Sequence, residues 1–170
     1  QLSLSMLADA ARSAMSISLM IYAILIGATV FAEFLNFSGA HEGVLAVVRD
    51  AGLAPWAVIA TILAIYLVLG CVLESLSMML LTVPLFFPIV TGLGFDPVWF
   101  GIMVVMAVEI GLITPPLGMN LFVMRTVVRD VPLVTLYRGV APFVAADVLR
   151  LALLAAVPGI SLFLPELLFR

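Results

Sequence analysis

Long apolar runs, each interrupted or ended by a few polar residues, dominate the pattern along the chain. A helix needs about 20 mostly apolar residues to cross a bilayer, and several of these runs approach or exceed that length. The pattern therefore predicts an all-α integral membrane protein. It divides the chain into an interfacial or preceding helix end at 1–15, a transmembrane helix at 16–36, an external connection at 37–54, a helical hairpin at 55–91 with its tip at 73–77, a broken transmembrane helix at 98–124 with its break at 111–118, a cytoplasmic loop at 125–138, a transmembrane helix at 139–157, and an apolar tail at 158–170.

The segment 55–91 admits two interpretations. An uncharged run that begins at Pro55 is followed by the polar stretch Glu74-Ser75-Leu76-Ser77, and then by a second apolar run that contains Pro84 and Pro88. The segment is either two ordinary spans with Glu74 at the membrane surface, or a re-entrant hairpin whose tip reaches mid-membrane. The short, proline-interrupted second run favours the hairpin, although periodicity alone does not decide between the two.

The most informative stretch, Gly111 to Asn120, reads Gly-Leu-Ile-Thr-Pro-Pro-Leu-Gly-Met-Asn and lies inside an uncharged run. Pro115 and Pro116 remove two backbone donors, and Pro115 disfavours helical dihedrals at Thr114. A helix must therefore break here. Broken backbone at membrane depth is tolerated only where it is buried in protein or lines a polar cavity. In secondary transporters such breaks bind coupling ions and substrate, so we expect a functional break rather than a kink that only shapes packing.

The chemistry of such a break suits ions. The first half-helix would end in free carbonyl groups with partial negative charge, which together with the Thr114 hydroxyl could bind Na⁺. The second half-helix would begin with free amides that attract anions. Gly111 and Gly118 allow another element to approach the backbone closely, and Asn120 can both donate and accept hydrogen bonds.

Ionisable and hydroxyl side chains near these features are further candidates. Glu74, Ser75 and Ser77 cluster at the tip of the predicted hairpin, and Glu109 lies two residues before the break. An ionisable residue inside the membrane is a functional hypothesis by default. The alternatives are a solvated surface turn for the tip and a structural role for Glu109.

Composition excludes several classes of function. The chain is 65% hydrophobic and 10% charged, against about half and about a quarter for soluble domains. It has no basic patch for nucleic acid. It has no phosphate-binding loop and no nucleophile–base constellation, so we expect neither an enzyme nor a cofactor. The single Cys71 and single His41 do not suggest a metal site.

Positive residues predict the orientation. Arg125, Arg129 and Arg138 place the 125–138 loop in the cytoplasm by the positive-inside rule. The hairpin would then enter from the external face. The first span would run outward from the side of Arg12.

Three stretches resemble, in order, the large membrane subunit of the tripartite ATP-independent periplasmic (TRAP) transporters. They are Gly70–Pro88, the Phe95-Asp96-Pro97…Phe100-Gly101-Ile102 segment, and Glu109–Val123 with its Gly-Leu-Ile-Thr-Pro-Pro core. The resemblance implies a multi-pass protein of the bacterial inner membrane, built as one inverted repeat of an elevator-type transporter with a re-entrant hairpin and a discontinuous helix. It covers only the second of the two repeats of that family. The chain is accordingly expected to be a fragment, or a half that works with a first repeat on another chain.

The resemblance also implies a site. The expected Na⁺ ligands are Gly70, Gly111, Thr114 and Leu117, and the expected substrate or ion pathway comprises Glu74, Ser75, Ser77, Glu109, Pro115, Pro116, Gly118 and Asn120. The sequence departs from the family at Leu73-Glu74-Ser75, where an Asp followed by Pro is frequent, and at Ala107, where an Asn is common.

The function implied is uptake of an organic acid, such as a C4-dicarboxylate, sialic acid or a similar carboxylate. A Na⁺ gradient would drive it. The expected partners are a periplasmic substrate-binding protein, a small membrane subunit, the missing first repeat and the lipid bilayer. The alternatives are an elevator-type anion carrier without a binding protein, and a non-transporting membrane anchor or assembly module. An anchor, however, gains nothing from Thr-Pro-Pro at mid-membrane.

Overall fold

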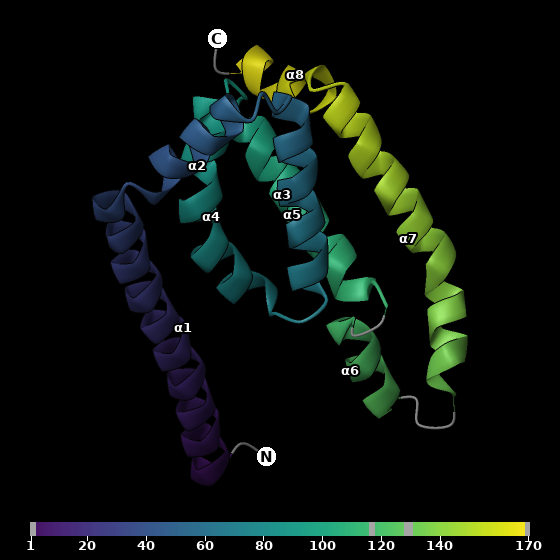
Figure 1. Cartoon of the computed structure of the whole chain (residues 1–170). Coiled ribbons are helices and arrows are strands. Elements are labelled where there is room, and N and C mark those ends of the chain that lie inside the picture. The colour runs from purple at the N-terminus through teal and green to yellow at the C-terminus, as the bar shows by residue number, and fades with distance from the viewer. Residues whose placement is uncertain (1–2, 116–117, 128–130, 169–170) are drawn as a thin grey trace.

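The computed structural model describes residues 3–115, 118–127 and 131–168, except for the side chain of Arg49, and all regular structure in these ranges is helical (Figure 1). The helices are α1 (Leu4–Ser38), α2 (Ala40–Asp50), α3 (Pro55–Gly70), α4 (Ser75–Gly92), α5 (Pro97–Ile113), α6 (Met119–Val127), α7 (Leu133–Ala156) and α8 (Gly159–Leu168). In the described part of the chain, α1, α4 and α7 are long and apolar enough to cross a membrane. The predicted all-α architecture is confirmed, and it is consistent with an integral membrane protein.

Several boundaries differ from those drawn on the sequence. The first helix is continuous from Leu4 to Ser38, with no boundary at residue 15, because Asp9 and Arg12 are compatible with a helix that extends beyond the apolar run. The 37–54 connection contains α2, and the 158–170 tail contains α8. The last long helix begins at Leu133 rather than at 139, directly after Pro132, because proline is well suited to a helix start.

Helices α3 and α4 form an antiparallel hairpin whose tip points toward the α5–α6 junction (Figure 1). Helix α5 lies against the hairpin and against α7 and is the central element, with nine of its 17 residues buried. By contrast, α1 buries Leu35 and exposes most other side chains, as expected of a helix that faces lipid or another subunit. The core is shared mainly by α3, α4 and α5 and includes Ile59, Tyr66, Met78, Val90, Trp99, Phe100 and Met103.

A buried hydrogen bond joins the two legs of the hairpin. The Thr82 hydroxyl on α4 lies 2.9 Å from the Tyr66 hydroxyl on α3 and 2.7 Å from the Met78 carbonyl oxygen. Tyr66 is 0% exposed and Thr82 is 6% exposed, so neither group can exchange this partner for water. The bond therefore fixes the register of the two legs, and with it the position of the tip.

Candidate functional site

The hairpin and the broken helix meet at two glycines. A Cβ atom added to Gly111 would lie 2.7 Å from the Cα atom of Gly70 and 3.2 Å from the carbonyl oxygen of Leu67. A Cβ atom added to Gly70 would lie 3.0 Å from the Cα atom of Gly111 and 3.3 Å from the carbonyl oxygen of Val108. Both positions therefore require glycine, because the two backbones are in direct contact. The contact places the C-terminal end of α3 against the last turn of α5.

The break begins three residues after Gly111. Thr114 is extended (φ −86°, ψ 132°), and its amide donates to the carbonyl of Gly111 at 3.1 Å. Its hydroxyl donates to the carbonyl of Ile110 at 2.5 Å. In a continuous helix, the amides of residues 115 and 116 would donate to the carbonyls of Gly111 and Leu112. Both residues are prolines and have no N–H, so these two helical hydrogen bonds cannot form. The end of α5 thus presents carbonyl oxygens beside a threonine hydroxyl.

The chain resumes as a helix through Gly118. The amide of Gly118 donates to the carbonyl of Thr114 at 3.1 Å, and α6 begins at Met119. A Cβ atom added to Gly118 would lie 3.1 Å from the carbonyl oxygen of Thr114 and 3.2 Å from the carbonyl carbon of Ile113, so this glycine lets α6 start close to the end of α5. The predicted site residues Pro116 and Leu117 lie outside the described residues.

At the hairpin tip, Glu74 is the N-cap of α4. Its carboxylate accepts hydrogen bonds from the amides of Leu76 and Ser77, both at 2.9 Å. It also accepts from the hydroxyls of Ser77 at 2.9 Å and Ser75 at 3.4 Å. The three polar residues predicted at the tip therefore form one local cluster. The N-terminal end of α4 favours the negative charge of this carboxylate.

A cavity of about 320 Å³ separates the tip from the second half-helix. It is lined by Cys71 and Val72 of the tip and by Met119 and Phe122 of α6. Cys71 is buried, and its thiol donates to the carbonyl of Leu67 at 3.2 Å. From the sequence, Cys71 was considered only as a metal ligand and was not placed at this cavity. A Cys directly after the Gly of a helical hairpin was the available signal.

Two predicted residues lie apart from the glycine contact. Glu109 is exposed on the face of α5 that also exposes Val98, Gly101 and Val105, whereas Gly111 is buried on the face toward α3. Asn120 is exposed on α6. The structure therefore brings Gly70 against Gly111 and Gly118 against Thr114, whereas the side chains of Glu109 and Asn120 are exposed.

The donor set at the contact consists of oxygen atoms. Carbonyl and hydroxyl oxygens are the ligands that hard cations prefer. Among the described residues, no group of three or more His, Cys, Asp and Glu side chains could hold a metal ion. The end of α5 does offer carbonyl oxygens and the Thr114 hydroxyl, which are atoms of the kind that bind hard cations.

Comparison with known proteins identifies the family. Residues 1–160 match the family described as "Tripartite ATP-independent periplasmic transporter, DctM component". The chain belongs to this TRAP transporter family. The match covers the hairpin, the break and both long outer helices, and the resemblance inferred from the sequence is confirmed at the level of the family.

Individual relatives carry the names of different substrates. The chain is 34% identical over 150 residues to the C4-dicarboxylate TRAP transporter large permease protein DctM of Pseudomonas aeruginosa, covering 88% of this chain and 35% of the relative. It is 46% identical over 101 residues to the sialic acid TRAP transporter large permease protein SiaM of Vibrio cholerae, covering 59% and 23%. It is 31% identical over 140 residues to the ectoine TRAP transporter large permease protein TeaC of Halomonas elongata, covering 82% and 33%. The chain thus spans about a third or less of the length of these relatives.

Proposed function

We propose that this chain is the second repeat of a TRAP large permease subunit, and that the Gly70–Gly111 contact and the adjacent break form a Na⁺ site. The observation that carries the proposal is the approach of the two glycine backbones. A Cβ atom added to Gly111 would lie 3.2 Å from the Leu67 carbonyl oxygen of α3, and the Thr114 hydroxyl bonds the Ile110 carbonyl in the same last turn of α5, which supports a site made of oxygen atoms from both helices. Gly70, Gly111, Thr114 and Leu117 would supply the ligands. Oxygen ligands from two separate segments would make ion binding depend on hairpin closure.

The substrate would bind next to this site, at the cavity between the tip and α6. The first amides of α6 favour an anionic group, because the N-terminal end of a helix attracts negative charge. C4-dicarboxylates, sialic acid and ectoine all contain a carboxylate, so the relatives named for them are consistent with a carboxylate in this position. We infer that the substrate is an organic acid. Ser75, Ser77, Glu74, Gly118 and Asn120 would line its path, Pro115 and Pro116 would maintain the break, and Glu109 would face the rest of the subunit.

In a membrane, the hairpin would be re-entrant. Both free ends of α3 and α4 lie at the same end of the hairpin, and α3 has 16 residues, which is short for a complete span. The hairpin would enter from the external face of the bacterial inner membrane and would move with α5 and α6 as an elevator. A periplasmic binding protein, a small membrane subunit and a first repeat would complete the transporter.

The decisive experiment is Na⁺-dependent uptake by the complete transporter in proteoliposomes. Thr114→Ala removes the hydroxyl at the break and should raise the half-saturating Na⁺ concentration, while Thr114→Ser should retain the native value. Thr61→Ala is the matched control. Its hydroxyl makes the same kind of bond, to the carbonyl of Ala57 at 2.8 Å, but on an exposed part of α3. An unchanged Na⁺ dependence in Thr114→Ala would remove Thr114 from the ligand set.

A further inference from the structure

The last turn of α3 contains a carbonyl group that has lost its helical donor. In a continuing helix, the amide of Cys71 would bond the carbonyl of Leu67, four residues earlier. Here this amide donates to the carbonyl of Val68 at 3.2 Å, and the next two amides along the chain both donate to the carbonyl of Leu69. The thiol of Cys71 takes the vacant place and donates to the Leu67 carbonyl at 3.2 Å. Because a thiol is a weak donor, it pairs this oxygen atom only weakly.

The end of the broken helix has the same hydrogen-bond pattern. The amide of Thr114 donates to the carbonyl three residues earlier, that of Gly111, and its hydroxyl donates to the carbonyl four residues earlier, that of Ile110. Cys71 and Thr114 are the C-cap residues of α3 and α5. Each therefore bonds a carbonyl of its own last helical turn through its side chain, one with a thiol and the other with a hydroxyl. Cys71 is the counterpart of Thr114 on the hairpin.

The Leu67 carbonyl lies at the contact between the two helices. Its oxygen atom would be 3.2 Å from a Cβ atom added to Gly111, so it faces the glycine of the opposite helix. Cys71 also lines the cavity beside α6, so this end of α3 borders that cavity. A carbonyl oxygen has two lone pairs, and one that is held by a thiol can still bind a cation.

We propose that the Leu67 carbonyl is a further ligand of the cation site, and that the Cys71 thiol is a positioning group that sets the affinity for the cation. The inference rests on the proposed function, because it adds a ligand to the same site. A donor hydrogen carries a partial positive charge, which repels a cation bound to the same oxygen atom. A thiol therefore orients the carbonyl and lowers the cation affinity only slightly, whereas a hydroxyl at residue 71 would lower it more.

The test measures Na⁺ binding by the complete transporter in detergent, as the rise in its unfolding temperature when NaCl replaces choline chloride. Cys71→Ser introduces a stronger donor that can reach the same carbonyl, as the hydroxyl of Thr61 reaches the carbonyl of Ala57 at 2.8 Å. It should raise the half-saturating Na⁺ concentration by about threefold or more. Cys71→Ala removes the donor from the Leu67 carbonyl and should lower that concentration.

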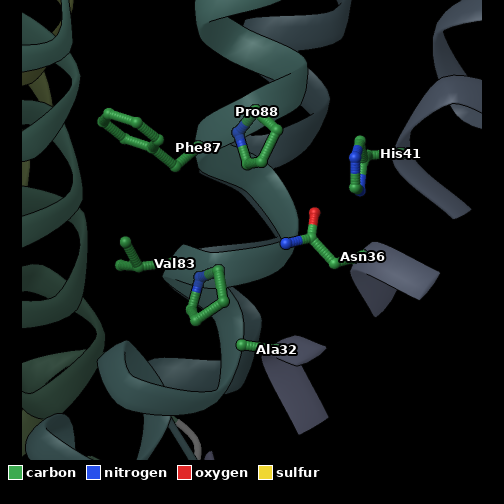
Figure 2. Close-up of a pocket in the computed structure, with 7 residues that line it drawn as sticks. Ala32, Asn36, His41, Val83, Phe87 and Pro88 are labelled. Carbon is green, nitrogen blue, oxygen red and sulfur yellow. The ribbon is translucent and has the colours of Figure 1, made fainter. Parts of the chain in front are cut away.

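A control variant and a second readout separate this effect from a purely structural one. Thr91→Ala removes a hydroxyl that bonds the carbonyl of Phe87 at 2.9 Å, also four residues earlier. Phe87 lines a separate pocket, where α1 and α2 meet α4 (Figure 2). This variant should therefore keep the native half-saturating Na⁺ concentration. If the Cys71 thiol only stabilised the fold, its variants would change the unfolding temperature without Na⁺ and leave the half-saturating concentration unchanged.

The order of the three proteins decides the result. A half-saturating Na⁺ concentration that rises from Cys71→Ala through the parent to Cys71→Ser supports the proposal. Equal concentrations or the reverse order overturn it. If Thr114→Ala still weakens Na⁺ binding in the same assay, the Na⁺ site of the proposed function stands without the Leu67 ligand. A parent protein that Na⁺ does not stabilise would instead reject the proposed Na⁺ site itself, and this ligand with it.

Discussion

The indole nitrogen of Trp99 donates a hydrogen bond to the carbonyl oxygen of Leu154 at 3.1 Å. Leu154 lies near the end of α7, and the residue four positions later is Pro158, which has no N–H. The carbonyl thus lacks its helical donor, and Trp99 of α5 supplies one. This bond ties the start of the broken helix to the end of the last long helix.

Loss of this donor should destabilise the protein. Trp99→Phe keeps most of the apolar ring but leaves the Leu154 carbonyl unpaired in an apolar setting, which costs about 1–3 kcal/mol. We expect a lower temperature of unfolding in detergent for this variant. Trp56→Phe is the control, because Trp56 stacks edge-to-face on Phe95 and Trp99 but is half exposed. Equal stability of Trp99→Phe and the parent would show that the bond contributes nothing.

Removing either hydroxyl of the Tyr66–Thr82 pair should lower the stability of the protein, but by different amounts. Tyr66→Phe leaves the Thr82 hydroxyl with its second partner, the Met78 carbonyl, so the loss should be about 1 kcal/mol. Thr82→Val leaves the buried Tyr66 hydroxyl unpaired, and the loss should reach about 1–3 kcal/mol. Urea unfolding of the two variants measures the difference. The opposite order would show that Tyr66 has another partner.

Glu74 provides a test of a capping role at the tip. Glu74→Ala removes the acceptor for two backbone amides and should lower stability by about 1 kcal/mol. Glu74→Asp keeps a carboxylate that suits the N-cap position and should keep both stability and uptake. Thermal unfolding and uptake of both variants check this. If Glu74→Asp is stable but inactive, the carboxylate has a role beyond capping and belongs to the ion or substrate pathway.

Local rules explain which parts of this fold could be predicted. Two adjacent prolines after Thr114 are sufficient to end a helix, so the end of α5 at Ile113 follows from the sequence. The start of α7 at Leu133 could have been predicted from Pro132. The continuous α1 could not be predicted from the apolar run, because charged residues such as Arg12 mark a change of environment without ending a helix.

At the candidate site too, local sequence rules identify single residues but not the contacts between helices. Each glycine of the Gly70–Gly111 contact was a candidate by itself, but their separation depends on how two helices pack, and no local pattern reports that. The sequence placed Glu74 at the tip as an ion-pathway candidate, whereas its capping contacts appear only once α4 is known to begin at Ser75. The Tyr66–Thr82 bond joins residues on different helices and was missed for the same reason.

The most direct test of the central claim compares two glycines of α5 in the complete transporter. Gly111→Ala forces the α3 and α5 backbones apart, whereas Gly101→Ala adds a methyl group where nothing lies within 4 Å. If the contact forms the Na⁺ site, Gly111→Ala should raise the half-saturating Na⁺ concentration for uptake by about tenfold or more, equivalent to about 1.4 kcal/mol. Gly101→Ala should leave it unchanged. A Gly111→Ala protein with native Na⁺ dependence would contradict the account.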